Sequence, residues 1–286
     1  MTTLVNSLQI FTSLKNNNIH KRFGLCGHPV SHSLSPALFA AAYPRSAFSY
    51  ELIPASEPRE AIRLFWKGGF TGINVTAPLK SSILLHTHRQ TPECTAIGAC
   101  NLIIKEGDVL VAHNTDFLGV LHSLHEAKVS LKNTKCLLIG AGGAAKAAAY
   151  ALLQSGATLL WANRTPAHIP GFFQGTLVTI LPLHQAVDYL LSCTLIINTL
   201  PLSVPDTERF VFHPRHTVFD ASYDARPLEK QAQQAGAKYI GGERWLLHQA
   251  IPSFTAMTGM SPDVSAIKFA FIQINPYFSQ NILNIP

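Results

Sequence analysis

Short apolar runs separated by turn residues mark the strands in the first part of the chain. Three strands are expected at residues 23–26, 48–53 and 72–76. Residues 56–66 have the spacing of an amphipathic helix, which we expect Ser56 to cap and Gly68 and Gly69 to end. A hairpin is expected where Lys-Glu-Gly-Asp joins two further strands, at residues 101–104 and 109–111. This alternation of strands with a helix predicts an α/β layer structure.

The rest of the chain repeats the alternation with longer helical stretches. Four more strands are expected at residues 135–139, 158–162, 195–197 and 217–219. Helices are expected at residues 117–129 and 140–153, and again from residue 243, with Pro252 and Pro262 as breaks or starts. The pattern predicts an α/β protein of two domains. The first comprises residues 1–116 completed by 243–286, and the second, 117–242, is a Rossmann-like domain with a doubly wound parallel sheet.

Composition narrows the class of protein. The 286 residues are enough for about two domains. Hydrophobic residues make up 47% of the chain, yet no apolar run reaches the ~18 residues of a membrane span. The net charge of +6 comes from scattered Lys and Arg, which argues against nucleic acid and membrane partners and favours small anionic ligands. The five cysteines form no CxxC pair and residues 1–20 lack a secretory signal pattern, so we expect a cytoplasmic protein.

A glycine-rich sequence follows the strand expected at 135–139 and opens the next helix. Its residues are Gly140, Ala141, Gly142, Gly143 and Ala144, followed by Ala145 in the place of the third glycine of a GxGxxG pattern. Such a loop lets a pyrophosphate approach the backbone at the positive end of a helix. A purely structural turn remains the alternative, because glycine turns between strands and helices are common.

The end of the following strand predicts which dinucleotide binds. About 20 residues after the glycine motif, NAD-binding folds usually carry an acidic residue for the ribose hydroxyls. Here the sequence is Asn163-Arg164-Thr165, with no carboxylate. Arg164 suits a 2′-phosphate, and Asn163 and Thr165 offer further polar contacts, so NADP is favoured over NAD. An ordinary surface arginine is the alternative.

Three other polar motifs stand at expected strand ends. Ser33 and Ser35 lie before a helix expected to open near Pro36, where they suit either a ligand carboxylate or plain turn chemistry. Lys80 begins a helix after the strand that ends in Asn74 and Thr76, and a lysine there either donates a proton to a developing alkoxide or is simply solvated.

The third of these motifs, residues 113–116, ends in Asp116, which also fits a helix N-cap. Several histidines stand in pairs, at 86/88, 122/125 and 213/216. These pairs lack a third ligand, so no metal is expected.

Taken in order, these motifs resemble the shikimate dehydrogenase family. The matching segments are Gly-x-Pro-x-x-His-Ser-x-Ser-Pro at 27–36, Asn-Val-Thr-x-Pro-x-Lys at 74–80, Gly-Ala-x-Asn at 98–101, Asn-Thr-Asp at 114–116, the glycine loop with Asn-Arg-Thr, and 242–249. The resemblance covers about residues 22–275. It implies a substrate domain and a cofactor domain separated by a cleft. It also implies NADPH-dependent, reversible reduction of 3-dehydroshikimate to shikimate, a step of aromatic amino acid biosynthesis, by a monomer or homodimer.

The family pattern assigns roles to individual residues. It implies Lys80 and Asp116 as the catalytic pair. The implied substrate-binding residues are Ser33 and Ser35 for the carboxylate, Thr76, Asn101 and Gln249 for ring hydroxyls, and Tyr223 nearby. The implied cofactor-binding residues are those of the glycine loop, Asn163, Arg164, Thr165 and, beside the nicotinamide, Gly242.

The chain departs from the family pattern at four places. Leu102 follows Asn101 where Thr is usual, Ser203 replaces a glycine after Thr199, Trp245 replaces Met, and 166–168 lacks a second basic residue beyond a histidine. Two other interpretations stay open. One is an enzyme of the same fold that acts on quinate or an aminated analogue, and the other is a ligand-sensing homologue without activity. The presence of both Lys80 and Asp116 favours an enzyme.

Overall fold

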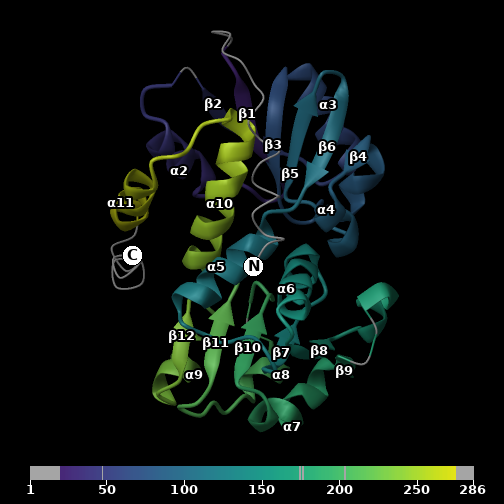
Figure 1. Cartoon of the computed structure of the whole chain (residues 1–286), viewed down its shortest axis with the longest axis vertical. Coiled ribbons are helices and arrows are strands. Elements are labelled where there is room, and N and C mark those ends of the chain that lie inside the picture. Colours follow the sequence, from purple (N-terminus) through teal and green to yellow (C-terminus); the bar gives the residue numbers. More distant parts are fainter. Residues whose placement is uncertain (1–19, 47, 174, 176, 203, 275–286) are drawn as a thin grey trace. The chain divides into compact units, whose positions relative to one another are not determined.

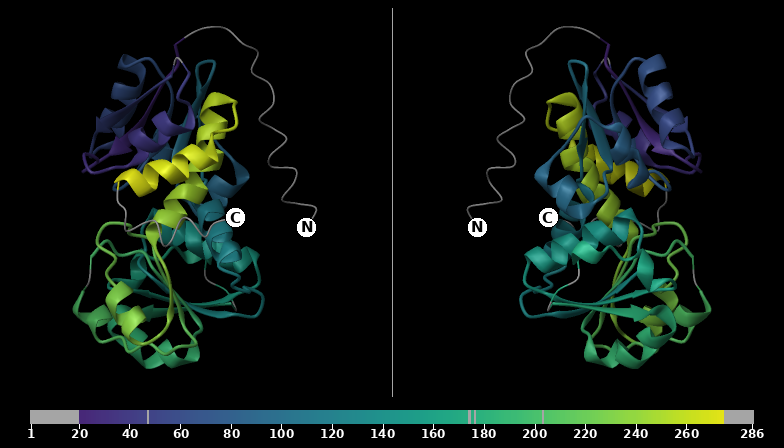
Figure 2. Two further views of the ribbon diagram at one scale, coloured as in Figure 1. Left: turned by 90° about the vertical axis from the view of Figure 1, so that its left-hand side faces the viewer. Right: turned by 90° about the vertical axis from the view of Figure 1, so that its right-hand side faces the viewer.

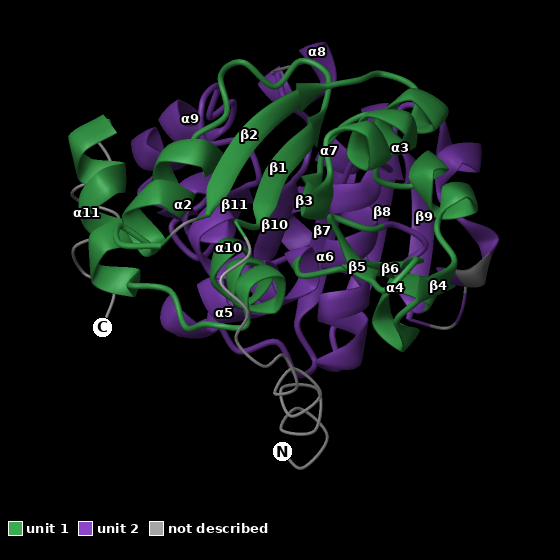
Figure 3. Cartoon of the chain, turned by 90° about the horizontal axis from the view of Figure 1, so that it is seen from above, with its two compact units in different colours: residues 1–95, 100–115, 250–274 green, residues 96–99, 116–249, 275–286 purple. Residues whose placement is uncertain are grey.

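The structure is a computed structural model that describes residues 20–46, 48–173, 175, 177–202 and 204–274 (Figure 1). The predictions for residues 1–19 and for Ser203 lie outside the described residues. The described chain forms two compact units (Figure 3). Unit 1 draws on residues 1–95, 100–115 and 250–274, and unit 2 on residues 96–99, 116–249 and 275–286. Within the described residues no helix has the length and apolar character needed to cross a membrane.

Unit 1 is built on a six-stranded mixed sheet of order β2-β1-β3-β5-β6-β4. Its strands are β1 (Arg22–Gly27), β2 (Ser49–Pro54), β3 (Phe70–Val75), β4 (Arg89–Gln90), β5 (Leu102–Glu106) and β6 (Val109–His113). Its helices are α2 (Ser35–Ala42), α3 (Pro58–Lys67), the short η2 (Ser82–His86), most of α4 (Pro92–Ile97), the end of α10 (Gly242–Thr258) and α11 (Val264–Ile274). The parallel strands β2, β1 and β3 meet an antiparallel hairpin of β5 and β6, as the sequence predicted.

Aliphatic and aromatic side chains cover the two faces of this sheet differently. The amphipathic helix α3 buries Ala61 and Phe65 against Ile53 and Phe70 on one face. An aromatic cluster joins Phe23 of β1, Phe39 of α2 and Phe254 of α10, with ring centroids 5.5 and 5.0 Å from that of Phe39. Apolar side chains therefore pack on both faces of the sheet.

Unit 2 contains a six-stranded, fully parallel sheet of order β12-β11-β10-β7-β8-β9. Its strands are β7 (Lys135–Ile139), β8 (Thr158–Asn163), β9 (Val178–Pro182), β10 (Leu195–Asn198), β11 (Thr217–Asp220) and β12 (Lys238–Ile240). Its helices include α5 (Asp116–Glu126), α6 (Gly143–Gln154), α7 (Ala186–Tyr189), α8 (Pro205–Glu208), α9 (Glu229–Gln234) and the start of α10. Short 3₁₀ turns are η3 (Pro166–His168), η4 (Gly171–Phe173), η5 (Leu183–Gln185) and η6 (Leu190–Ser192).

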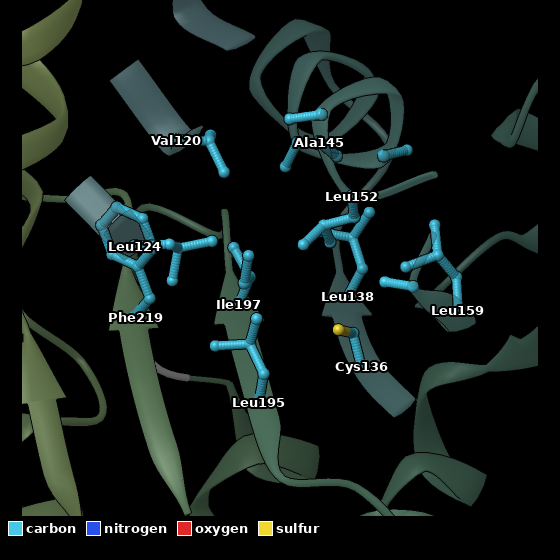
Figure 4. Packing of buried hydrophobic residues seen from close by; sticks show 14 of the residues in the cluster. Val120, Leu124, Cys136, Leu138, Ala145, Leu152, Leu159, Leu195, Ile197 and Phe219 are labelled. Carbon is cyan, nitrogen blue, oxygen red and sulfur yellow. The ribbon is translucent and has the colours of Figure 1, made fainter. Parts of the chain in front are cut away.

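Counted from its first strand, this sheet has the order 3-2-1-4-5-6 of the doubly wound dinucleotide-binding fold. Helices α5 and α6 pack on one face, where Leu124 and Leu152 meet Leu138 and Ile197 (Figure 4). Helices α7 and α9 pack on the other face (Figure 2). The α/β fold with a Rossmann-like sheet is therefore confirmed.

Three local predictions are corrected by the structure. Helix α3 has Glu57 rather than Ser56 at its N-cap, because Pro58 already occupies its first turn. Lys80 lies in a turn, and only the short η2 follows it. Pro252 lies inside α10 without ending it, because buried Leu247 and Phe254 on either side hold the helix in place. Unit 2 extends through the first turns of α10 to Gln249.

Candidate functional site

The glycine loop of unit 2 has two glycines with opposite constraints. Gly140 has φ of 106°, and a Cβ there would lie 2.2 Å from the Thr199 hydroxyl oxygen, so only glycine fits. Trp161 Nε1 donates a 2.6 Å hydrogen bond to the Gly140 carbonyl and fixes its direction. At Gly142, by contrast, a Cβ would meet no protein atom within 4 Å. The backbone is thus held firmly at one glycine and left accessible at the next.

Gly142 is also the N-cap of α6, a helix of 12 residues whose first turn contains Gly143 and Ala144. No side chain caps this helix at Gly142, so backbone N–H groups at its positive end remain for an anion. An open approach, a helix N-terminus and a fixed strand-to-helix turn fit the pyrophosphate of a dinucleotide.

Strand β8 is a neighbour of β7 in the sheet, and its end carries polar and cationic side chains. Asn163 Nδ2 donates to the Thr165 carbonyl at 2.8 Å, which shapes the turn. Arg164 and Thr165 are exposed. Because no carboxylate stands at residues 163–165, nothing there would repel a 2′-phosphate, and the Arg164 guanidinium would attract it.

Two buried polar residues, Asn198 and Asp220, form hydrogen bonds that stabilise the ends of β10 and β11. The sequence analysis assigned neither of them a role. Asn198, at the end of β10, donates to Asp220 Oδ1 at 2.8 Å and accepts from the Leu200 N–H at 3.2 Å. Asp220 also accepts from the Leu228 N–H and from the Tyr239 hydroxyl, both at 3.0 Å. Burial raises the pKa of Asp220 above its ordinary value, while these hydrogen bonds oppose the rise.

Thr199, the residue after Asn198, connects these strand ends to the glycine loop. The Thr199 hydroxyl donates a 2.7 Å hydrogen bond to the carbonyl of Ile139, the residue that precedes Gly140. Thr199 supports the glycine loop through its side chain.

Gly242 begins α10 against the strand end of β11. A Cβ at Gly242 would lie 2.4 Å from the Ala221 carbonyl oxygen. The close approach requires glycine and fixes the helix start beside the loop that carries Tyr223, which is half-buried. Gly242 and Tyr223 therefore both lie next to the carboxyl end of β11. Ligands of this fold class bind at that edge of the parallel sheet.

Unit 1 gathers its candidate ligand residues in a chain of side-chain hydrogen bonds. Ser33 Oγ donates to Ser35 Oγ at 3.2 Å, and Ser35 hydrogen-bonds the Tyr50 hydroxyl. Tyr50 in turn donates to Asn74 Oδ1 at 2.8 Å. Burial raises the pKa of Tyr50, so its phenol stays protonated and remains a donor. The serines before α2 are thus coupled to the strand ends of β2 and β3.

The network continues from Asn74 into the hairpin. Asn74 Nδ2 donates to the Asn101 carbonyl at 3.0 Å and to Ser253 Oγ at 2.6 Å. The Asn101 side chain donates to Thr115 Oγ1 at 2.9 Å and accepts from the Thr115 N–H at 2.7 Å. Tyr50 and Ser253 were missed from the sequence, because a single polar residue in a strand or helix carries no recognisable spacing. Thr115 belongs to the Asn-Thr-Asp motif, but the sequence analysis assigned it no role of its own.

Lys80 and Thr76 lie at the end of β3, next to this network. The Lys80 carbonyl accepts the Cys100 N–H at 2.7 Å, which ties its turn to the residue before Asn101. The Thr76 N–H donates to the Cys26 carbonyl at 2.9 Å. Lys80 is half-buried. The structure therefore brings Ser33, Ser35, Thr76, Lys80 and Asn101 to the strand ends of one unit.

Asp116 and Gln249 belong to unit 2. Asp116 is the first residue of α5 and is only 4% exposed. Gln249 lies on α10, which approaches α5 so closely that a Cβ at Gly119 would lie 3.0 Å from the Gln249 Cβ. Gln249 Nε2 donates to the Leu246 carbonyl at 3.1 Å.

Cysteine and metal chemistry find no support in the described residues. All five cysteines are buried, and none of them forms a disulfide. Burial, with a smaller contribution from neighbouring groups, raises the pKa of Cys26, Cys94 and Cys136 to about 12, so their thiols stay protonated. No group of three or more His, Cys, Asp and Glu in the described chain is placed to hold a metal.

A parallel sheet of this order, with a glycine loop after its first strand, defines the class of Rossmann-fold dinucleotide-binding proteins. Residues 25–103 match the family model of the shikimate dehydrogenase substrate binding domain. A relative from Carboxydothermus hydrogenoformans, named shikimate dehydrogenase (NADP(+)), is 33% identical over 275 residues, covering 90% of this chain and 98% of the relative. The chain belongs to the shikimate dehydrogenase family.

Solved structures agree with this assignment. Shikimate 5-dehydrogenase from Thermus thermophilus, solved in complex with NADP(H) and shikimate, is 32% identical with a TM-score of 0.75 and covers 88% of this chain and 99% of its own. Quinate dehydrogenase from Corynebacterium glutamicum, solved in complex with NAD, is 25% identical with a TM-score of 0.77 and covers 88% and 99%.

Proposed function

We propose that the protein is an NADP-dependent oxidoreductase that reduces 3-dehydroshikimate reversibly to shikimate, in aromatic amino acid and chorismate biosynthesis. The observation that carries the proposal is the hydrogen-bonded network of unit 1, from Ser33 through Tyr50 and Asn74 to Asn101. It offers hydroxyl and amide groups suited to a small polyhydroxylated carboxylic acid. The family model covers this same part of the chain.

In the proposed mechanism, unit 1 serves as the substrate domain. Ser33 and Ser35 bind the substrate carboxylate, while Thr76 and Asn101 hold ring hydroxyls. Gln249 and Tyr223, from unit 2, complete the contacts. A network of fixed donors and acceptors favours one orientation of the substrate, and orientation supplies much of the rate.

Unit 2 serves as the cofactor domain. Backbone groups of residues 140–144 hold the pyrophosphate, and Asn163, Arg164 and Thr165 hold the 2′-phosphate side. Gly242 would line the nicotinamide side. When bound, NADPH supplies the hydride.

The proton chemistry belongs to this chain's own side chains. Lys80 donates a proton or a hydrogen bond to the C3 oxygen as negative charge develops on it, which stabilises the transition state. Asp116 orients Lys80 and a substrate hydroxyl.

The proposal extends to the setting of the protein. Five cysteines that form no disulfide suit a reducing compartment, so we propose a cytoplasmic enzyme. It acts on small molecules as a monomer or homodimer.

One assay tests the proposed function. Purified protein is incubated with shikimate or quinate, each with NADP⁺ or NAD⁺, and the reduced nicotinamide is followed by absorbance. We expect turnover of shikimate with NADP⁺ to be the fastest combination. Faster turnover of quinate would favour the alternative represented by the quinate dehydrogenase neighbour. No turnover with either substrate would leave a ligand-sensing homologue.

A further inference from the structure

A buried ion pair joins the loop after β11 to the start of α10. Arg226 Nη2 lies 2.9 Å from Glu243 Oε2, and its Nη1 lies 3.1 Å from Glu229 Oε1. The side chain of Arg226 is 9% exposed and that of Glu243 is 0% exposed. Arg226 also has φ of 45°, an uncommon conformation for a residue other than glycine. The uncommon backbone conformation and the buried ion pair thus occur at the same residue.

Two consecutive glycines make room for this arrangement. A Cβ at Gly241 would lie 2.2 Å from Glu243 Oε2, because the Glu243 carboxylate folds back over Gly241 to reach Arg226. A Cβ at Gly242 would collide with the Ala221 carbonyl oxygen at 2.4 Å. Gly241 therefore accommodates the carboxylate, and Gly242 accommodates the strand end.

A contribution to folding stability does not by itself explain the Arg226–Glu243 ion pair. Glu243 Oε1 is buried with no hydrogen-bond partner in the described structure. Burial disfavours the charged guanidinium, but Glu243 and Glu229 outweigh it and raise the pKa of Arg226, so the charge persists. Replacing a buried ion pair by neutral side chains is often neutral or stabilising. A role in geometry explains why the charges are kept.

The residues on either side of the pair indicate what it positions. Gly242 immediately precedes Glu243, and Tyr223 lies three residues before Arg226 in the same loop. We propose that the Arg226–Glu243 pair positions Gly242 and Tyr223 at the nicotinamide side of the site and so sets the geometry of hydride transfer. This inference rests on the proposed function. Both charged groups are assigned as positioning residues, because they act through Gly242 and Tyr223.

The test separates geometry from stability with two variants. Arg226→Met leaves Glu243 buried and unpaired, so it should lower both the thermal midpoint and kcat. Adding Glu243→Gln removes the charge of the fully buried carboxylate and should restore most of the thermal midpoint, because the other partner, Glu229, is 13% exposed and is solvated more easily. We expect kcat of this double variant to stay about tenfold to a hundredfold below wild type, because the loop and helix start are no longer held together. The KM for shikimate should rise by a smaller factor than kcat falls, because the proposed contacts of Ser33, Ser35, Thr76 and Asn101 remain and only the Tyr223 contact is disturbed.

Arg244→Gln is the matched control. Arg244 is the next residue of α10, and it makes a 3.1 Å pair of similar burial with Glu126 of α5, away from the loop after β11. This variant should lose stability and keep the wild-type kcat. A primary deuterium isotope effect, measured with shikimate labelled at C3, should rise in the double variant and stay unchanged in the control.

Three results decide the matter. Recovery of kcat together with the thermal midpoint in the double variant would show a purely structural pair and overturn the proposal. An equal loss of kcat in Arg244→Gln would overturn it too, because any loosening of α10 would then suffice. If wild-type protein turns over neither shikimate nor quinate, it is the proposed function that fails, and the positioning role is withdrawn with it.

Discussion

The two units prepare for their ligands in different ways. In unit 1 the candidate groups are side chains that bond one another, from Ser35 to Tyr50 to Asn74 to Asn101. In unit 2 the central groups are backbone atoms of residues 140–143, shaped by glycines. A ring carrying hydroxyls and a carboxylate needs donors and acceptors at defined angles, whereas a pyrophosphate needs a positive, uncrowded surface. The substrate side should therefore be sensitive to loss of side chains, and the cofactor side to their addition.

The largest expected effect is on the side-chain-based unit. Lys80→Ala should fold normally and lose about 10²–10⁴-fold in kcat, the usual contribution of a general acid–base group. Steady-state kinetics with shikimate and NADP⁺ measure this loss. Lys67→Ala, at an exposed lysine of α3 in the same unit, is the control and should keep full activity. A Lys80→Ala enzyme with more than half of the wild-type kcat would rule out the catalytic role.

The second prediction addresses the serines at the start of α2. Ser33→Ala combined with Ser35→Ala should raise the KM for shikimate far more than the KM for NADP⁺. Each lost hydrogen bond to a carboxylate should cost about 1.5–3 kcal/mol. Ser46→Ala removes a hydroxyl that bonds only the Tyr43 carbonyl and serves as the control. A parallel rise of both KM values would point to a disturbed domain and not to a lost substrate contact.

The third prediction tests the backbone-based unit by adding a methyl group at two glycines. Gly140→Ala forces a residue with φ of 106° against Thr199, so it should lose about 1–3 kcal/mol of unfolding free energy and also bind NADP⁺ poorly. Gly142→Ala meets no protein atom within 4 Å. It should keep its stability and still raise the KM for NADP⁺, because the methyl group occupies the approach of the pyrophosphate. Denaturant unfolding and NADP⁺ titration provide the two measurements. Unchanged NADP⁺ binding in Gly142→Ala would contradict the proposal that the backbone of the glycine loop binds the pyrophosphate.

The same contrast explains which parts of the fold could be predicted from the sequence. Strong apolar runs such as 135–139 and the glycine motif predicted the parallel sheet and its loop, because local pattern and tertiary role coincide there. The strands β4 (Arg89–Gln90) and β12 (Lys238–Ile240) are too short to show a period. The Ser56 cap failed because Pro58 determined where the helix begins.

Within the candidate site, motif residues were visible and their supports were not. Tyr50 resembles any aromatic residue of a half-buried strand until its hydroxyl is seen to bond Asn74. Arg226 and Glu243 are 17 positions apart, and no helical or strand spacing connects them. Pairings between distant segments depend on the fold, so a single sequence does not reveal them.

The smallest expected effect concerns the one cationic side chain that the cofactor side is proposed to use. Arg164 is exposed at the end of β8, where residues 163–165 carry no acid. A charge-assisted contact with phosphate is stronger than a neutral hydrogen bond, so NADP⁺ should exceed NAD⁺ in kcat/KM by about tenfold or more, equivalent to about 1.4 kcal/mol. Arg164→Ala should remove much of this preference by raising the KM for NADP⁺, and it should leave NAD⁺ kinetics nearly unchanged.

Salt should weaken the NADP⁺ preference in the wild type, because the contact is exposed and therefore screened. Arg209→Ala, at another exposed arginine of unit 2, should alter neither cofactor's kinetics. Kinetics of wild type and both variants with the two cofactors at two ionic strengths provide the measurement. An equal loss with NAD⁺ and NADP⁺ would mean that Arg164 supports the adenine side or the fold. The cofactor side would then select its ligand by backbone alone, and the 2′-phosphate assignment would have to be withdrawn.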